Sequence, residues 1–252
     1  MKDILVVYPH GLGDCVLLTP TLREYYKKTG EKLHIATLER FRSAQFFNNN
    51  PYVDQIFYTK DAWHDYPNSQ VGFQSIYTDW KSVAKEKGFR GVVMPMHSEP
   101  INKILLNFRF LGITATDQHQ TEIFTTAEDA SIANSIIEEK VGPEPFGFAQ
   151  TSTGVPSKDL PQGYGRQWLS DNLGLEKVIE IGQEIDPLEY NINVQFEILR
   201  RAAGVCIPDS VFYHACHAIN KEVDFVYFGR GPAIYNRVCP LHEAIENVVF
   251  VL

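Results

Sequence analysis

The apolar residues of this chain gather in short runs, and stretches of mixed apolar and polar residues separate the runs. The runs are rich in Val, Ile, Leu and Phe, a composition typical of strands that are buried on both faces of a sheet. They cover residues 4–8, 33–37, 53–58, 91–96, 146–150, 178–181, 205–207, 223–228 and 248–252. We expect each of these runs to form a β-strand.

The stretches between the runs repeat apolar residues at helical spacing and predict helices. The first helix follows Gly11-Leu12-Gly13-Asp14 and stops at Gly30. The other predicted helices cover residues 39–47, 75–87, 100–111, 127–140, 194–203 and 211–219. Residues 59–74 and 151–165 are predicted to be loops. This alternation of strand and helix indicates an α/β fold, with parallel sheets and helices on both of their faces.

The chain is predicted to divide into two domains at Gly142-Pro143-Glu144-Pro145. Two prolines in four residues prevent the preceding helix from continuing, and the composition is that of a linker. The predicted domains are residues 1–142 and 143–252, and the second repeats the strand–helix order of the first. A chain of 252 residues is long enough for both.

Composition narrows the possible functions. An apolar content of 44% and a charged content of 21% are ordinary for a globular protein. The net charge of −8 argues against a nucleic-acid partner, which requires a basic surface, although a few cations and backbone N–H groups can still hold a small anion. The first apolar run is too short to span a membrane, so we expect a cytoplasmic protein.

The cysteines form no Cys-x-x-Cys pair, so we expect them to be reduced thiols. They are Cys15, Cys206, Cys216 and Cys239.

The turn at Gly11-Leu12-Gly13-Asp14 is the first candidate site. Its glycines let the backbone approach a ligand closely, and the helix that follows offers unpaired N–H groups to an anion or a sugar hydroxyl. Val16 stands where the dinucleotide fingerprint has its third glycine, so the turn is not that motif. The alternative is a plain strand-to-helix turn with Asp14 as the N-cap.

Two later segments are also candidates. Asp209 and Ser210 follow a strand and begin a helix whose first N–H groups can face a ligand, and His214 lies one turn further on. The alternative is a capped helix with a buried histidine. Lys158 lies in the loop after the first strand of the second half, where a lysine can neutralise a diphosphate, or can simply be solvated.

Two groups of residues stay undecided or carry little weight. His214 and His217 share one face of a helix, but no third ligand has suitable spacing, so no metal site is predicted. The aromatic residues of the loop that begins at residue 59, and of the helix after it, belong either to the core or to an acceptor cleft. They are Trp63, His64, Tyr66, Phe73, Tyr77 and Trp80.

Taken together, residues 11–23 (Gly-Leu-Gly-Asp-Cys-Val-Leu-Leu-Thr-Pro-Thr-Leu-Arg) resemble the opening of the ADP-heptose:lipopolysaccharide heptosyltransferases, glycosyltransferase family 9. The likeness continues through residues 33–37 and 50–54. The segment at residues 158–161 (Lys-Asp-Leu-Pro) is similar to that family's Lys-x-Trp-Pro. Residues 209–214 (Asp-Ser-Val-Phe-Tyr-His), followed by Phe228-Gly229, are similar to its Asp-Ser/Thr-Gly-x-x-His motif. The order of these motifs holds across nearly the whole chain.

The resemblance implies a GT-B architecture, in which two Rossmann-like domains face a central cleft. The N-terminal domain would hold the acceptor and the C-terminal domain the nucleotide-sugar donor. The implied reaction is an inverting, metal-independent sugar transfer to a glycan or lipopolysaccharide-type acceptor, with at most peripheral membrane contact. ADP-heptose is the default donor, and no cofactor is implied.

The resemblance also implies roles for single residues. Asp14 would be the general base, in the loop with Gly11 and Gly13. The donor would be bound by Lys158, Asp209, Ser210 and His214, and Glu184 would match an acidic residue of the donor pocket. Lys158 and the N–H groups after Asp209 would stabilise the leaving diphosphate.

Several departures from the family pattern support a different class of function. Val211 replaces a glycine of the donor motif, Leu160 replaces a tryptophan, and Gly229-Arg230-Gly231-Pro232 replaces the usual turn. The second domain is also expected to be shortened. The alternative function is therefore a catalytically degenerate GT-B module for binding or assembly. A Val211 side chain that fills the donor pocket would support this alternative.

A nucleotide-sugar epimerase is a third possibility, and the missing third glycine after Gly13 argues against it. An active transferase requires Asp14, Lys158 and Asp209 to converge on one cleft.

Overall fold

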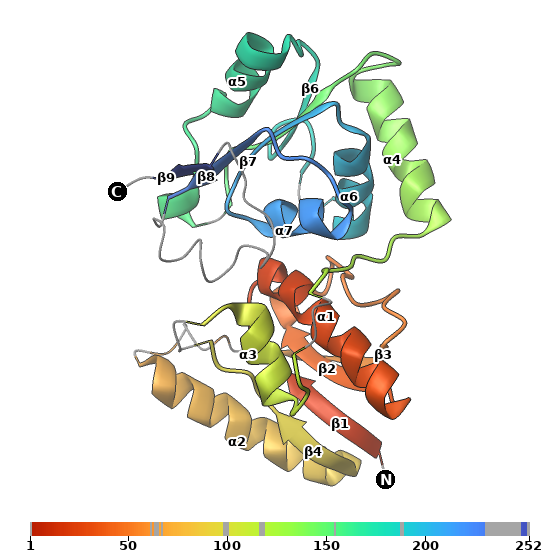
Figure 1. Cartoon of the computed structure of the whole chain (residues 1–252), viewed down its shortest axis with the longest axis vertical. Helices are drawn as coiled ribbons and strands as arrows, with labels where there is room; N and C mark the ends of the chain where they lie inside the picture. The colour runs from red at the N-terminus through yellow and green to blue at the C-terminus, as the bar shows by residue number, and fades with distance from the viewer. Residues whose placement is uncertain are drawn as a thin grey trace. The chain divides into compact units, whose positions relative to one another are not determined.

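A computed structural model describes residues 2–60, 62, 66, 68–97, 101–115, 119–153, 155–186, 189–229 and 248–250 of the chain. Its contacts divide the chain into two compact units, Met1–His119 and Gln120–Leu252. The division lies before helix α4 (Ala127–Lys140), whereas the sequence placed it after this helix. Helix α4 belongs with the second unit because it packs on α6 (Ile192–Arg201), as Figure 1 shows.

The first unit is a parallel four-stranded sheet with the strand order β3-β2-β1-β4. Its elements are β1 (Lys2–Val7), α1 (Leu12–Thr29), β2 (Leu33–Leu38), η1 (Glu39–Phe41), β3 (Val53–Thr59), α2 (Ser69–Lys87), β4 (Phe89–Val93) and α3 (Lys103–Phe110). Leu5 and Val7 of β1 pack with Phe73 and Ile76 of α2, which covers one face of the sheet. Helices α1 and α3 pack against each other on the opposite face (Figure 1).

The second unit is a parallel five-stranded sheet with the strand order β6-β5-β7-β8-β9. Besides α4 and α6, its elements are β5 (Gly147–Gln150), η3 (Pro156–Lys158), α5 (Tyr164–Leu173), β6 (Val178–Ile181), β7 (Gly204–Pro208), α7 (Val211–Ala218), β8 (Phe225–Phe228) and β9 (Val248–Phe250). Leu169 of α5 lies in one core cluster with Ala149 of β5 and Cys206 of β7. Helices α6 and α7 pack together.

The α/β fold and its parallel sheets are confirmed, and three helix predictions need correction. Residues 39–47 form only the short η1 followed by turns, and Gln45 has a positive φ of 53° that ends any helix. Helix α2 begins at Ser69 rather than 75, because the Asn68 side chain accepts hydrogen bonds from the N–H groups of Gln70 and Val71. Helix α5 was not predicted, because only Gly165 and Leu169 of its residues are buried, too few to give an apolar pattern of helical period.

None of the described helices is long and apolar enough to cross a membrane. Some sequence predictions fall outside the described residues. These are Trp63, His64, Cys239 and the turn residues Arg230, Gly231 and Pro232. Phe73, Tyr77 and Trp80 of the undecided aromatic group lie on α2 and belong to the core of the first unit, as does Tyr66.

Candidate functional site

Each unit has one place where its strand order reverses. In the first unit this switch point lies between β1 and β4, because β2 and β3 extend to one side of β1 and β4 pairs with the other. The loop after β1 carries His10, the first turn of α1 that follows carries Asp14, and the loop after β4 carries His97. Ligands of open α/β sheets bind at the carboxyl edge of such a point. The chain therefore places titratable side chains where a ligand is expected.

Asp14 lies within the first turn of α1 and does not cap it. The N-cap is Gly11, in extended conformation and without a side-chain capping bond, and Gly13 lies inside the helix. The alternative that made Asp14 a simple N-cap is therefore wrong. Its carboxylate instead forms an ion pair with the Lys103 ammonium at the start of α3. The two side chains are 18% and 17% exposed, so solvent reaches the pair only partly.

Two histidines accompany Asp14. The rings of His10 and His97 stack with centroids 4.3 Å apart. His10 Nε2 lies 2.8 Å from the Pro95 carbonyl oxygen, and His97 Nε2 lies 3.0 Å from Asn107 Oδ1. The sequence analysis missed both histidines and Lys103, because nothing in the sequence reveals that β4 pairs with β1. The sequence does hold one signal, which is a polar residue after each buried run. Together with the strand order, this signal would have identified these residues as candidates.

The electrostatics of this cluster follow from burial and from Lys103. Burial opposes ionisation of Asp14, but the Lys103 ammonium and the two imidazoles outweigh it and hold the pKa of Asp14 well below its usual range. Burial, and then the neighbouring His97, lower the pKa of His10 to about 3. At neutral pH Asp14 is therefore charged and His10 is neutral.

The second unit has its switch point between β5 and β7. Lys158 follows β5, and Asp209 follows β7. Lys158 Nζ donates to the Asp209 carbonyl oxygen at 2.9 Å and lies 3.0 Å from Asp209 Oδ2. The Asp209 side chain is only 2% exposed and that of Lys158 15%, so Lys158 is not a solvated surface lysine. The structure thus joins two residues that are far apart in the sequence.

The other predicted donor residues each make contacts of their own. Ser210 caps α7, because its Oγ accepts a hydrogen bond from the Phe212 N–H at 3.3 Å. His214 is buried on α7 against the Tyr213 ring. Glu184 pairs with Arg166, and its second oxygen accepts from the Glu180 N–H at 2.9 Å. The Glu184 carboxylate therefore contacts the backbone at the end of β6. That Glu184 belongs to a donor pocket stays a prediction.

The departures from the family motif have identifiable places. Leu160 is buried in the core cluster beneath α5. Val211 is half-buried in the first turn of α7, directly after the Ser210 cap. A Cβ at Gly229 would lie 2.0 Å from the Ser157 carbonyl oxygen, so only glycine fits there. The end of β8 therefore packs closely against η3, the short helix that ends with Lys158.

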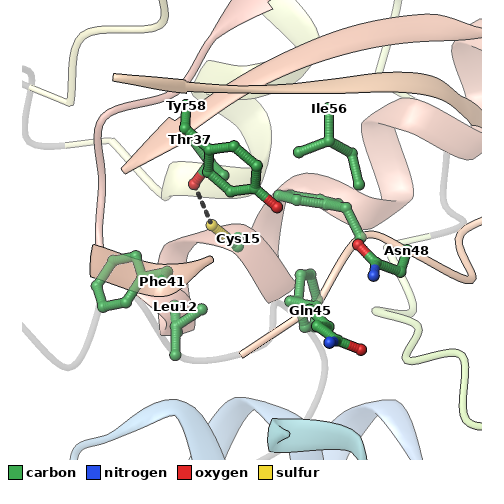
Figure 2. A pocket seen from close by; sticks show the side chains of 10 residues that line it. Leu12, Cys15, Thr37, Phe41, Gln45, Asn48, Ile56 and Tyr58 are labelled. Atoms are coloured by element: carbon green, nitrogen blue, oxygen red, sulfur yellow. Dashed lines mark hydrogen bonds between the residues drawn. The ribbon is translucent and has the colours of Figure 1, made fainter. Parts of the chain in front are cut away.

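A small recess of about 10 Å³, roughly the space of one water molecule, lies beside the start of α1 (Figure 2). Its walls come from α1, β2, β3, η1 and the turns after η1. The lining residues are Leu12, Cys15, Thr37, Phe41, Gln45, Phe46, Phe47, Asn48, Ile56 and Tyr58. Leu12 and Cys15 of α1 lie on either side of Asp14 in the sequence, but the recess is too small to hold a sugar or a nucleotide base.

The described cysteines are free and buried, in agreement with the sequence prediction of reduced thiols. They are Cys15, Cys206 and Cys216. Burial raises the pKa of Cys206 to about 12 and that of the other two thiols still further. None of these thiols is therefore a candidate nucleophile.

Comparison with known proteins gives no family model and no curated protein that matches the sequence. Solved structures do match. A glycosyl transferase of family 9 from Veillonella parvula DSM 2008 superposes with a TM-score of 0.69 at 14% identity, over 99% of this chain and 86% of that one. The E. coli ADP-heptose LPS heptosyltransferase II gives 0.62 at 12% identity, over 100% and 90%. The E. coli heptosyltransferase WaaC with ADP gives 0.59 at 12% identity, over 100% and 91%.

The chain has the GT-B fold. The resemblance first noted in the sequence is therefore confirmed at the level of the fold, as are the two Rossmann-type units. Within this GT-B chain, Asp14 belongs to the first unit, and Lys158 and Asp209 belong to the second. Their convergence on one cleft stays a prediction.

Proposed function

We propose that this protein is a glycosyltransferase that moves a sugar from a nucleoside-diphosphate donor to a hydroxyl of a glycan or lipopolysaccharide-type acceptor. The observation that carries the proposal is the Lys158–Asp209 pair at the switch point of the second unit. A lysine at this edge supplies the charge that a diphosphate requires. The shared fold with heptosyltransferases makes heptose the default sugar, and ADP the default nucleotide.

The second unit would hold the donor and stabilise the leaving group. The Lys158 ammonium and the first N–H groups of α7 would stabilise the negative charge that the diphosphate gains as the sugar leaves. Asp209, already oriented by Lys158, would accept hydrogen bonds from sugar hydroxyls. Ser210 caps the start of α7, and the buried His214 lies one turn further along the same helix.

The first unit would supply the base. Asp14 would remove the acceptor hydroxyl proton while the acceptor oxygen forms its bond to the anomeric carbon. The bond between that carbon and the diphosphate oxygen breaks on the opposite face, so the configuration inverts. A carboxylate with a very low pKa is a weak base, so we expect Lys103 to turn away from Asp14 when the acceptor binds. This step requires neither a metal nor a cofactor besides the donor.

The test is binding of ADP, UDP, GDP, CMP and their sugar conjugates, measured by thermal shift. We expect one nucleotide to raise the melting temperature of the wild type, and Lys158→Ala and Asp209→Ala to lose that shift. Lys177→Ala, which removes an exposed lysine of the same unit, is the matched control and should keep it. No shift with any nucleotide would contradict the proposal.

The second candidate is the catalytically degenerate GT-B module. The half-buried Val211 at the first turn of α7 favours it, because a β-branched side chain stands where backbone would approach the donor. This candidate predicts no turnover of any nucleotide sugar in the wild type. Restoration of nucleotide binding by Val211→Gly alone would support it.

A further inference from the structure

The residues at the switch point of the first unit form a cluster of hydrogen-bond acceptors. One nitrogen of His10, one nitrogen of His97 and one oxygen of Asp14 all lie within 4.8 Å of one another. Such a cluster attracts a cation, and the Lys103 ammonium already binds its carboxylate. Lys103 alone does not explain why two imidazoles are stacked beside the same carboxylate.

Hydrogen bonds assign the hydrogens of both rings. His10 Nε2 faces the Pro95 carbonyl oxygen at 2.8 Å, and His97 Nε2 faces Asn107 Oδ1 at 3.0 Å. The Asn107 amide is oriented independently, because its nitrogen donates to the Leu17 carbonyl oxygen at 3.2 Å. Both Nε2 atoms therefore carry a hydrogen, so in the neutral form of each ring Nδ1 carries the lone pair.

This pattern is the one that metal-binding histidines adopt. A ligating imidazole almost always donates its other N–H to a carbonyl or carboxylate, which sets the tautomer and the ring orientation. Here one ring uses a backbone carbonyl and the other a side-chain amide. Two imidazoles with one carboxylate suit borderline ions such as Zn²⁺, Co²⁺ and Fe²⁺ rather than Mg²⁺, which prefers oxygen ligands.

We propose that His10, Asp14 and His97 bind one divalent transition-metal ion of the zinc class, and that this ion competes with the Lys103 ammonium for Asp14. Three protein ligands leave at least one coordination position for water. Tetrahedral bonds of about 2.0–2.1 Å place ligand atoms about 3.4 Å apart, so atoms that now lie within 4.8 Å of one another must close by up to about 1.4 Å. The partial exposure of Asp14 and Lys103 gives the ion access and gives the ammonium room to leave.

The site has a regulatory consequence. A metal bound to Asp14 occupies the lone pair that would accept the acceptor proton, so a bound ion should inhibit sugar transfer. This consequence rests on the proposed function, whereas the binding of the ion does not. The nucleotide-binding test concerns the second unit, so the two proposals can fail separately.

The experiment titrates Co²⁺ into the full-length protein and follows the visible absorption of cobalt bound to nitrogen ligands, with Zn²⁺ displacing it. We expect one ion per chain for the wild type. Asp14→Asn, which preserves the shape of the side chain, and His97→Ala should each weaken binding at least tenfold. Lys103→Met should tighten binding about tenfold, because it removes the competing ammonium. His217→Ala is the control and should change nothing.

The tightening by Lys103→Met is the decisive outcome, because a variant that merely damages the fold would not bind more strongly. Circular dichroism melting curves confirm that each variant is folded. Absence of Co²⁺ absorption in both the wild type and Lys103→Met would overturn the proposal. Equal binding by the wild type, Asp14→Asn and His97→Ala would also overturn it, because the ion would then lie elsewhere.

Discussion

The ion pair between Asp14 and Lys103 should stabilise the first unit measurably. Lys103→Met keeps most of the length of the side chain but leaves the Asp14 carboxylate without the ammonium that it contacts. An exposed pair contributes about 0–1 kcal/mol, and breaking a fully buried pair costs about 3–5 kcal/mol. With both side chains less than one fifth exposed, we expect a loss of about 2–3 kcal/mol.

Hydrogen exchange of the β1 amides, followed by mass spectrometry, reports this loss for the first unit alone. A loss of about 2–3 kcal/mol corresponds to roughly 30- to 150-fold faster exchange. In a double-mutant cycle, Asp14→Asn should remove most of the effect of Lys103→Met, because no unpaired carboxylate then remains. Additive effects, or unchanged exchange in Lys103→Met, would refute the reasoning.

The same pair predicts a pH dependence with a definite sign. The pKa of Asp14 is lowered by folding, so its stabilising contribution is fully present above the unfolded pKa of about 3.9 and disappears as pH falls towards the folded pKa. The difference between the wild type and Lys103→Met should therefore be constant from pH 7 to about pH 5 and shrink below about pH 4. The exposed pair of Glu39 and Arg42 is the control, and its removal should leave β1 exchange unchanged.

Three more predictions concern the second unit. Lys158→Ala should lower stability by about 3–5 kcal/mol, because it leaves the buried Asp209 carboxylate unpaired, and urea unfolding followed by circular dichroism measures this loss. Gly229→Ala should weaken nucleotide binding at least tenfold by forcing η3 away from the end of β8, as calorimetry would show. Thr126→Ala should cost about 1 kcal/mol by removing the capping box of α4, measured by urea unfolding, whereas Thr126→Ser should cost much less.

Local signals in the sequence were sufficient to predict most of the fold. Gly30 ends α1 in a left-handed conformation with φ of 72°, and β2 is buried at every position. Pairing of consecutive strands with helices between them also follows from the pattern. Residues 39–47 show where this reasoning fails, because Phe41, Phe46 and Phe47 line a recess from η1 and the turns after it rather than from a helix.

The sequence predicted some residues of the candidate sites but not the partners that the fold brings to them. Lys158 and Asp209 each follow a buried run, and that position made them candidates without any knowledge of strand order, whereas Asp14 was the expected base only through the resemblance. His97 and Lys103 could be joined to Asp14 only after β4 was known to lie beside β1. Strand order depends on how the whole unit packs, and no stretch of sequence records it locally. Likewise, Glu184 carried a plausible acidic signal, but its partner Arg166 lies on a helix that the pattern did not reveal.

The buried thiols allow the opening rate of each unit to be measured separately. Cys15 lies in the first unit, and Cys206 and Cys216 lie in the second, all three with 0% exposure. A thiol reagent can modify them only when the surrounding structure opens, so the labelling rate measures how often each half unfolds. The measurement is made in a Cys239→Ser background, with and without a nucleotide. If the nucleotide slows the labelling of Cys206 and Cys216 but not that of Cys15, it stabilises the second unit and not the first.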